Sequence, residues 1–251
     1  MVSQYLELIM TTKQKIVSLM DLTQLGESDT DADIVKLCAK AKNSLGEVAA
    51  ICIYKQFVPV VKKTLGSDFK VATVINFPKG NSSVEEVISE AKEAISLGAD
   101  EIDLVIDYNE YIQKGHSQQS CDMIEKVKNV CQDRILKVII ESGELNEDNL
   151  ISKASHDAIV NGANFVKTST GKTPNGASLE AAKVILETIK NSGYEVGFKA
   201  SGGIRDEAQA LGYIKLAEEI MSKNYVVADT FRFGVSGLLD NLLNGEISSG
   251  Y

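Results

Sequence analysis

The 251-residue chain has little positive charge for its size. It contains 26 Lys and Arg against 35 Asp and Glu, a formal net charge of −9, and its pI is about 4.9. Nonspecific binding to nucleic acid or to an anionic membrane requires a positive field, so we expect neither as a partner. An anionic substrate would need a cationic site of its own.

Long apolar runs are also missing. No segment approaches 18 consecutive apolar residues, and the N-terminus carries the acidic Glu7 instead of a basic region followed by an apolar stretch. We therefore expect a soluble cytoplasmic protein without a membrane partner.

Cysteine and histidine are scarce and lack the spacing of a metal site. A chain of this length does not need disulfide staples, so we expect free thiols. Two histidines are too few for the several nitrogen ligands that a catalytic zinc site commonly uses, so we predict no metal and no other cofactor. These residues are Cys38, Cys52, Cys121, Cys131, His116 and His156.

Proline and arginine are rare. Average usage of about 5% would give roughly a dozen prolines, but the chain has three. Few prolines leave the unfolded chain less constrained, and few arginines allow few bidentate ion pairs on the outer helices. Both trends predict mobile loops, a cool-growing source and lower heat stability than in mesophilic relatives, unless core packing compensates.

Eight apolar, strand-like segments alternate with segments of helical periodicity along the chain. This alternation in about 250 residues predicts an α/β fold, a single (β/α)8 TIM barrel over residues 1–251, with an extra N-terminal helix at 1–13 and a flexible tail at 245–251. The expected strands cover 15–23, 48–54, 70–76, 101–107, 135–141, the apolar part of 164–172 around Lys167, 195–201 and 229–236, and a loop with Gly171 and Lys172 follows the sixth of them. The expected helices between them cover 32–42, 58–65, 84–97, 117–131, 146–161, 178–191 and 206–221.

Two lysines lie within apolar strands. Lys167 in Asn164–Lys172 can point only into a barrel interior or a sheet crevice, where loss of solvation lowers the pKa of an amine and makes it a nucleophile for an aldehyde. The alternative is a strand-end lysine that reaches solvent. Lys199 has the same setting in 196–203, and two converging lysines would each depress the other's pKa.

Glycines and cations follow the last three strands, where (β/α)8 barrels often bind phosphate. Backbone N–H groups at glycine can approach an anion closely, although glycine is also an ordinary turn residue at strand ends. The residues are Gly171 and Lys172, Gly202, Gly203 and Arg205, and Gly234, Ser236 and Gly237.

Other polar residues sit on the expected barrel strands. Asp103, between apolar neighbours, is the best candidate for an interior carboxylate that passes protons and keeps one lysine charged. Asp21 and Thr23 share one side of the first strand, and a structural ion pair explains Asp21 equally well. Cys52 either lines the site or packs as a small apolar residue.

Several motifs together resemble the deoxyribose-phosphate aldolase family, in particular its enterobacterial branch. They are Lys-Thr-Ser-Thr-Gly-Lys at 167–172, Gly-Phe-Lys-Ala-Ser-Gly-Gly-Ile-Arg at 197–205, Glu-Ile-Asp-Leu-Val at 101–105, Asn-Phe-Pro-Lys-Gly at 76–80, Leu-Met-Asp-Leu-Thr at 19–23, Ala-Ala-Ile-Cys-Ile-Tyr at 49–54, Leu-Lys-Val-Ile-Ile-Glu at 136–141 and the terminal Tyr251. The likeness runs through nearly the whole chain.

The resemblance implies a metal-free class I aldolase of deoxynucleoside catabolism, which interconverts 2-deoxy-D-ribose 5-phosphate with acetaldehyde and D-glyceraldehyde 3-phosphate. It implies that Lys167 forms the Schiff base, that Lys199 lowers the pKa of Lys167, and that Asp103 relays protons. It further implies a homodimer and a C-terminal tail that reaches the active site, where Tyr251 assists proton exchange at the enamine carbon; the alternative is a frayed terminus.

We expect substrate contacts from residues of several loops and strands: Asp21, Thr23, Cys52, Thr170, Gly171, Lys172, Gly202, Gly203, Ile204, Arg205, Gly234, Ser236 and Gly237. One departure concerns Gly237, where enterobacterial relatives commonly have a second serine, so a hydroxyl contact to phosphate is lost. Two other functions compete: a different Schiff-base phospho-sugar aldolase with another carbonyl donor, and a phosphosugar-binding barrel without catalysis.

Overall fold

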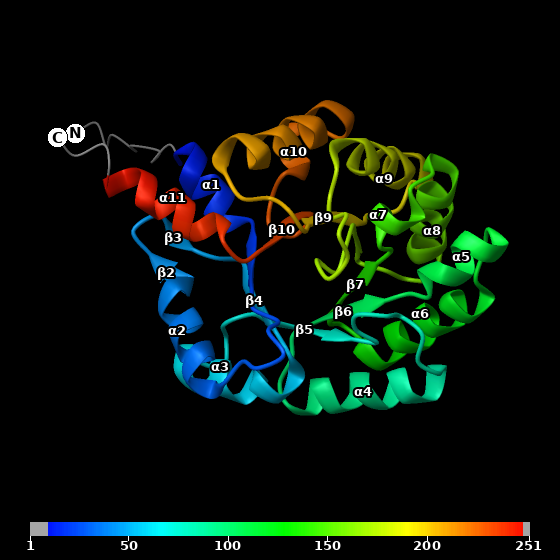
Figure 1. Ribbon diagram of the computed structural model, residues 1–251, viewed down its shortest axis with the longest axis horizontal. Helices are drawn as coiled ribbons and strands as arrows, with labels where there is room; N and C mark the ends of the chain where they lie inside the picture. The colour runs from blue at the N-terminus through cyan, green and yellow to red at the C-terminus, as the bar shows by residue number, and fades with distance from the viewer. Residues whose placement is uncertain (1–9, 248–251) are drawn as a thin grey trace, which may run out of the picture.

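The structure, a computed structural model, describes residues 10–247, and its centre is a closed barrel of eight parallel strands (Figure 1). The last strand pairs with the first, which closes the sheet. This confirms the predicted (β/α)8 barrel. The barrel strands are β1 (Met20–Thr23), β4 (Ala50–Ile53), β5 (Val71–Ile75), β6 (Glu101–Val105), β7 (Ile135–Ile139), β8 (Phe165–Lys167), β9 (Gly197–Ser201) and β10 (Phe231–Val235).

Helices surround the barrel on its outer side (Figure 1). The seven that were predicted between strands are α2 (Asp31–Ala41), α3 (Val58–Leu65), α4 (Val84–Ser96), α6 (Gln118–Cys131), α8 (Asp148–Val160), α9 (Leu179–Ser192) and α10 (Glu207–Ile220). Further elements are α1 (Thr12–Ser18), α5 (Tyr108–Lys114), α7 (Ser142–Leu145), α11 (Leu238–Ile247), the 3-10 turns η1 (Lys55–Phe57) and η2 (Lys223–Tyr225), and a small hairpin of β2 (Lys42–Asn43) and β3 (Gly46–Glu47). No helix within residues 10–247 combines the length and apolar character needed to cross a membrane.

Local sequence explains where several helices begin. Ser83 accepts from the backbone N–H of Glu86, and the Glu86 side chain accepts from the backbone N–H of Ser83, so a capping box starts α4. Thr30 and Asp33 form the same arrangement at α2. In α3, Pro59 occupies the first turn, where its missing N–H costs no helical hydrogen bond.

One prediction near the chain start was wrong. Residues 15–18 belong to a helix rather than to the first strand, because a capping box of Thr11 and Gln14 starts α1 there; residues 1–9 of the predicted N-terminal helix lie outside the described part. Strand β8 ends at Lys167, and residues 168–172 form the loop expected after it. Within the predicted C-terminal tail, residues 245–247 belong to α11, which starts at Leu238, and residues 248–251 lie outside the described part.

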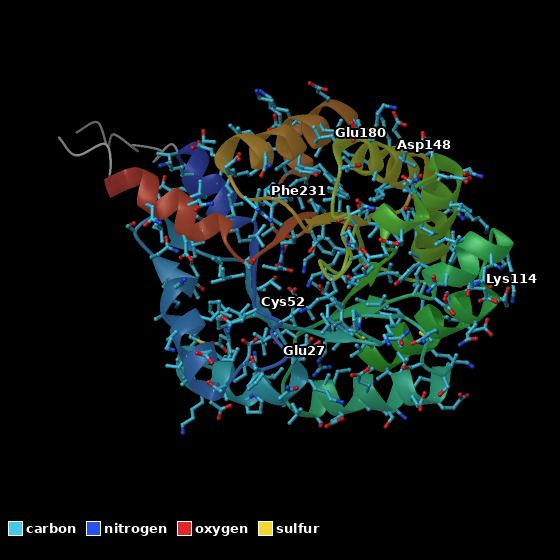
Figure 2. The ribbon with its side chains drawn as sticks, in the orientation of Figure 1. Glu27, Cys52, Lys114, Asp148, Glu180 and Phe231 are labelled. Carbon is cyan, nitrogen blue, oxygen red and sulfur yellow. The ribbon has the colours of Figure 1, made fainter. Side chains whose placement is uncertain are left out.

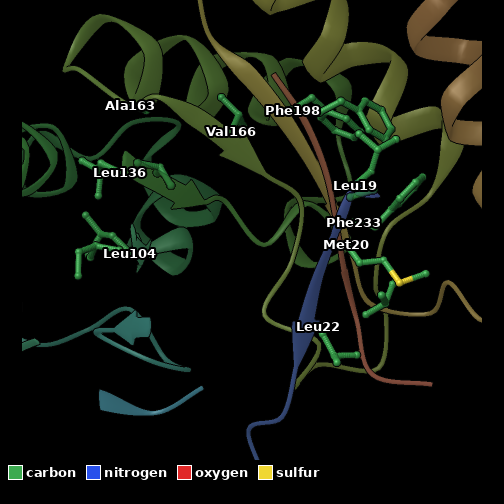
Figure 3. Close-up of a cluster of buried hydrophobic side chains, with 14 of the residues drawn as sticks. Leu19, Met20, Leu22, Leu104, Leu136, Ala163, Val166, Phe198 and Phe233 are labelled. Carbon is green, nitrogen blue, oxygen red and sulfur yellow. The ribbon is translucent and has the colours of Figure 1, made fainter. Parts of the chain in front are cut away.

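The strands separate an apolar outer surface from a charged interior. Figure 3 shows Met20, Leu22, Leu104, Val166 and Phe233 on the strands of the cluster that packs between the sheet and its helices. Because side chains alternate along a strand, the neighbours of these residues point into the barrel. The outer core thus fixes the register that brings the interior residues together.

Candidate active site

Seven charged side chains from six strands fill the barrel interior, none of them more than 3% exposed. The sheet register places them level with one another: Asp103 is opposite Lys137, and Lys167 is opposite Lys199. A buried charge is costly unless it is paired and hydrogen-bonded, so the ion pairs among these groups hold the arrangement together. The seven residues are Asp21, Glu101, Asp103, Lys137, Lys167, Lys199 and Arg232.

Asp103 is the centre of this network. Its Oδ2 accepts hydrogen bonds from Lys167 Nζ at 2.7 Å and from Lys199 Nζ at 2.8 Å. Its Oδ1 accepts from Lys137 Nζ at 3.0 Å. The structure therefore brings together the two lysines and the carboxylate that the sequence singled out.

The deeper part of the network joins Asp21 to Glu101. Arg232 donates to Asp21 Oδ1 at 2.5 Å and to Glu101 Oε1 at 3.2 Å. Lys137 donates to Glu101 Oε2 at 2.5 Å and lies 3.2 Å from Asp21 Oδ2.

Sequence reasoning gave no role to Glu101, Lys137 or Arg232. The signal was present, because each is a charged residue within an apolar strand, as Lys167 is. Glu101 precedes Asp103 by two residues, and Arg232 precedes Gly234 by two residues. Each pair therefore lies on the same interior face of its strand.

The charge balance favours a neutral Lys167. If every group were ionised, four cations would face three carboxylates, an excess of one positive charge. Lys199 pairs with Asp21 and Asp103, whereas Lys167 pairs with Asp103 alone. Lys167 therefore has fewer carboxylate partners than Lys199, and loss of its proton removes the excess positive charge.

The pKa shifts of Lys167 and Lys199 agree with this difference in carboxylate partners. Burial lowers the pKa of Lys167, and the charge of Lys199 lowers it further against the opposing effect of Asp103. Burial would also lower the pKa of Lys199, but Asp103 and Asp21 outweigh it and raise that pKa. The predicted effect of one lysine on the other appears in the lowered pKa of Lys167, while the pKa of Lys199 is raised on balance because Lys199 has a second carboxylate partner.

The carboxylates stay ionised in this setting. Burial would raise the pKa of Asp103, but Lys137, Lys167 and Lys199 hold it well below its usual range. Asp21 likewise has its pKa lowered, because Lys137, Lys199 and Arg232 overcome the effect of burial. Asp21 thus lies in ion pairs with Lys137, Lys199 and Arg232, as the structural interpretation of this residue predicts.

The opposite wall of the interior is apolar. Leu25, Cys52, Ala72 and Val74 form a small buried cluster at β4 and β5. Figure 2 labels Cys52 near the centre of the barrel. Burial raises the pKa of the Cys52 thiol, and the nearby charge of Asp103 raises it further, so Cys52 contributes a neutral, compact surface.

A cavity of about 750 Å³ lies at the carboxyl ends of the strands, and its lining does not include Lys167, Lys199 or Asp103. Gly234 lines this cavity and also approaches Lys199, since a Cβ at this position would lie 3.0 Å from Lys199 Cε and 2.4 Å from Ser201 Oγ. Eleven of the predicted substrate-binding residues line the cavity: Thr23, Thr170, Gly171, Lys172, Gly202, Gly203, Ile204, Arg205, Gly234, Ser236 and Gly237. Asp21 and Cys52 lie deeper, within the barrel interior.

Two adjacent loops provide the closest backbone approach to this cavity. Gly171, Gly202 and Gly203 adopt φ angles of 75°, 89° and 89°, a region that side chains with a Cβ rarely occupy. A Cβ on Gly202 would lie 3.1 Å from Gly176 Cα. These glycines are therefore required by the loop conformation, and they leave the rim of the cavity open.

Glu141, which sequence reasoning did not assign, holds the loop after β8. Its carboxylate accepts from Thr170 Oγ1 at 2.5 Å and from Thr170 N at 3.2 Å. Burial raises the pKa of Glu141 against the effect of these hydrogen bonds. In the same loop, two residues after Thr170, Lys172 Nζ donates to Leu25 O at 2.6 Å. This hydrogen bond joins the loop after β8 to the loop after β1.

The rim also contains residues without a sequence prediction. Lys40 on α2 and Asp240 on α11 form an ion pair of 2.8 Å at the cavity edge. Asn241 Nδ2 donates to Arg205 O at 2.7 Å. Tyr251, predicted to reach the site, lies outside the described residues.

Together, the fold and site define a (β/α)8 barrel with a buried, weakly compensated amine below a cavity suited to an anionic ligand. The chain belongs to the DeoC/LacD family of aldolases, which it matches over residues 15–239. It is thus an aldolase.

Solved structures support the same assignment. A protein from Toxoplasma gondii, provisionally assigned as a deoxyribose-phosphate aldolase, is 25% identical with a TM-score of 0.86, over 94% of this chain and 96% of that one. Another with the same provisional assignment, from Coccidioides immitis, is 29% identical with a TM-score of 0.82, over 93% and 86%. A tetrameric deoxyribose phosphate aldolase from Aeropyrum pernix, at 23% identity, shares the fold with a TM-score of 0.75 over 94% and 93%.

Proposed function

We propose that the protein reversibly cleaves 2-deoxy-D-ribose 5-phosphate to acetaldehyde and D-glyceraldehyde 3-phosphate through a Schiff base on Lys167. The observation that carries the proposal is the asymmetry of the lysine pair: Lys167 shares Asp103 with Lys199, while Lys199 has Asp21 as well. A neutral amine and a permanent ammonium within one site are what imine formation requires.

The proposed reaction uses the iminium as an electron sink. Lys167 Nζ attacks the aldehyde carbon, and loss of water leaves an iminium. The C2–C3 bond then breaks as the C3 hydroxyl loses its proton, and the bonding electrons form an enamine on Lys167. Protonation of the enamine carbon and hydrolysis release acetaldehyde and restore the amine. Asp103, with Lys199 as the charged donor beside it, is positioned to move these protons.

The phosphate is proposed to bind at the cavity rim. Lys172 and Arg205 supply positive charge, and the segments at Gly202–Gly203 and Gly234–Gly237 line the same cavity and would donate backbone N–H groups to the phosphate. Binding would replace the Leu25 carbonyl as the partner of Lys172. Gly237 leaves its backbone N–H but no hydroxyl for this contact.

The apolar wall favours acetaldehyde as the carbonyl donor over donors with polar substituents. The enamine of acetaldehyde carries no hydroxyl or carboxylate, and Cys52, Ala72 and Val74 offer no polar partner for one. A different Schiff-base phospho-sugar aldolase remains the competing function. The non-catalytic binder would have no use for the buried lysine pair.

Further properties follow from the proposal and the resemblance. We propose that no metal or other cofactor takes part in this reaction, that the pathway is deoxynucleoside catabolism in the cytoplasm, and that the functional unit is a homodimer. Membership of the enterobacterial branch remains a prediction. Sedimentation analysis tests the dimer directly.

Borohydride trapping tests the proposal. The protein is incubated with acetaldehyde, reduced, digested and analysed by mass spectrometry, with pyruvate and dihydroxyacetone phosphate as alternative donors. We expect an ethyl adduct on Lys167 with acetaldehyde, and release of glyceraldehyde 3-phosphate from 2-deoxyribose 5-phosphate in a coupled assay. Adducts with another donor alone would favour the competing aldolase, and a failure to trap any donor would favour the binder.

A further inference from the structure

A second group of chemically reactive side chains lies in the outer helical layer, where α5, α6 and α8 meet (Figure 1). His116 lies in the short junction between α5 and α6, Cys121 in the first half of α6 and Asp157 on α8. The potential ligand atoms of these three residues lie within 4.8 Å of one another. Lys114, labelled in Figure 2, marks the end of α5 just before this junction.

We propose that His116, Cys121 and Asp157 form a binding site for a zinc ion, separate from the barrel interior. An imidazole, a thiolate and a carboxylate are the donor types that Zn²⁺ takes, and in combination they suit Zn²⁺ better than Mg²⁺ or Ca²⁺, which take oxygen ligands. Tetrahedral bonds of about 2.0–2.3 Å separate ligand atoms by roughly 3.3–3.7 Å. Donor separations of up to 4.8 Å would therefore shorten by about 1 Å, while the 3.0 Å between His116 Nδ1 and Asp157 Oδ2 would lengthen slightly.

Neighbouring side chains orient the ligands as in known metal sites. Tyr111 Oη donates to Asp157 Oδ2 at 3.0 Å, and Lys153 Nζ donates to Oδ1 at 2.6 Å. His116 Nδ1 lies 3.0 Å from the Asp157 carboxylate, which can only accept, so Nδ1 donates there when no ion is bound. An ion at Nδ1 would replace that proton, and Nε2, 3.5 Å from Gln118 Oε1, would carry it instead. Such partners fix the geometry of a ligand and raise its affinity for the metal.

The charges balance when the ion is bound. Neutral His116, the Asp157 carboxylate and Cys121 as thiolate carry two negative charges, which neutralise Zn²⁺, and water solvates the ammonium of Lys153, whose side chain is 43% exposed. The thiol proton of Cys121 passes to solvent, and no electrons are transferred. His116 is 40% exposed, so the fourth position faces solvent and can hold water.

The alternative is a hydrogen-bonded cluster with no ion. His116 Nδ1 lies 3.0 Å from Asp157 Oδ2, and Tyr111 and Lys153 complete the partners of that carboxylate. This interpretation explains the buried Asp157, since its hydrogen bonds are satisfied. Cys121 also has Tyr111 as a hydrogen-bond neighbour, so metal binding itself decides between the two interpretations.

Metal binding to the purified, reduced full-length protein tests the site. After removal of metal with a chelator, Zn²⁺ is titrated by calorimetry, and Co²⁺ is added as a spectroscopic probe. We expect one Zn²⁺ per chain and, with Co²⁺, a thiolate-to-cobalt charge-transfer band together with visible absorption of tetrahedral intensity. Cys121→Ser should remove the charge-transfer band and weaken Zn²⁺ binding by at least about 100-fold, since loss of an outer-shell partner alone costs about 10–100-fold.

Matched variants separate this site from other thiols and histidines. Cys131→Ser changes another buried cysteine of α6, and His156→Gln changes the other histidine of the chain; both should bind Zn²⁺ as the parent protein does. Should Cys121→Ser not fold, His116→Gln alters a partly exposed junction residue and carries the same test. No stoichiometric binding by the parent protein, or Zn²⁺ affinity unchanged in both ligand variants, would overturn the proposal.

Discussion

Replacing Lys199 with leucine should move the pKa of Lys167 back toward its reference value of about 10.4. Both amines bind Asp103 Oδ2, at 2.7 and 2.8 Å, so their nitrogens are at most about 5.5 Å apart. At that distance and an effective dielectric constant of about 20, the repulsion between two unit charges is about 3 kcal/mol, or roughly a 100-fold change in an equilibrium constant. Removal of Lys199 also leaves Asp103 less neutralised, which holds the Lys167 proton more tightly.

The expected result is a shift of the pH profile, not only a loss of rate. Imine formation with acetaldehyde, measured by borohydride trapping in single-turnover experiments, should be about 100-fold slower than in the parent protein near pH 7, because loss of this repulsion favours the protonated amine of Lys167 by about that factor. The difference should shrink as the pH rises toward 10. A simple loss of geometry would instead lower the rate equally at every pH.

A surface lysine provides the control. Lys183 on α9 is largely exposed and pairs with Glu187 four residues away, so Lys183→Leu makes the same chemical change outside the barrel and should leave the profile unchanged. Thermal melts of both variants verify folding. A Lys199→Leu profile that coincides with that of the parent protein would refute the electrostatic coupling of the two lysines.

Four further predictions address the nucleophile, the phosphate site, the C-terminus and stability. Lys167→Met should abolish turnover and trapping while the fold persists; substantial aldolase activity would show that another residue is the nucleophile. Gly237→Ser has room for its side chain, because no atom lies within 4 Å of a Cβ there, and one added hydrogen bond of roughly 1 kcal/mol should lower KM about fivefold with little change in kcat; an unchanged KM would place the phosphate elsewhere. Deletion of Tyr251 should slow deuterium uptake into acetaldehyde more than it weakens phosphate binding, whereas equal losses would indicate general destabilisation. The thermal midpoint should lie below about 65 °C, the upper end for mesophilic domains, and a higher value would contradict the argument from few prolines and arginines.

The barrel could be predicted because its signals are local. Each strand is a short apolar run, and each helix has its own periodicity and cap, as Ser83 and Glu86 show at α4. The predicted bounds of α3 agree with the structure at both ends. The first strand was the exception, since the apolar residues Ile16 and Val17 fit a strand or a helix equally well and the capping box at Thr11 decided for a helix.

The sequence by itself therefore determined the fold class, the strand on which each candidate lysine lies and the loops that line the cavity, because a charged residue in an apolar strand and a glycine after it are visible without coordinates. Only the tertiary structure decided which charges pair. Register across the closed sheet gave Lys199 a second carboxylate and so raised its pKa, and it joined Lys137, Glu101 and Arg232 to the network. The approach of His116 and Cys121 to Asp157 likewise depends on how α8 packs beside α5 and α6. Electrostatic interactions depend on distances between elements that are remote in sequence, and only the folded, closed barrel fixes those distances.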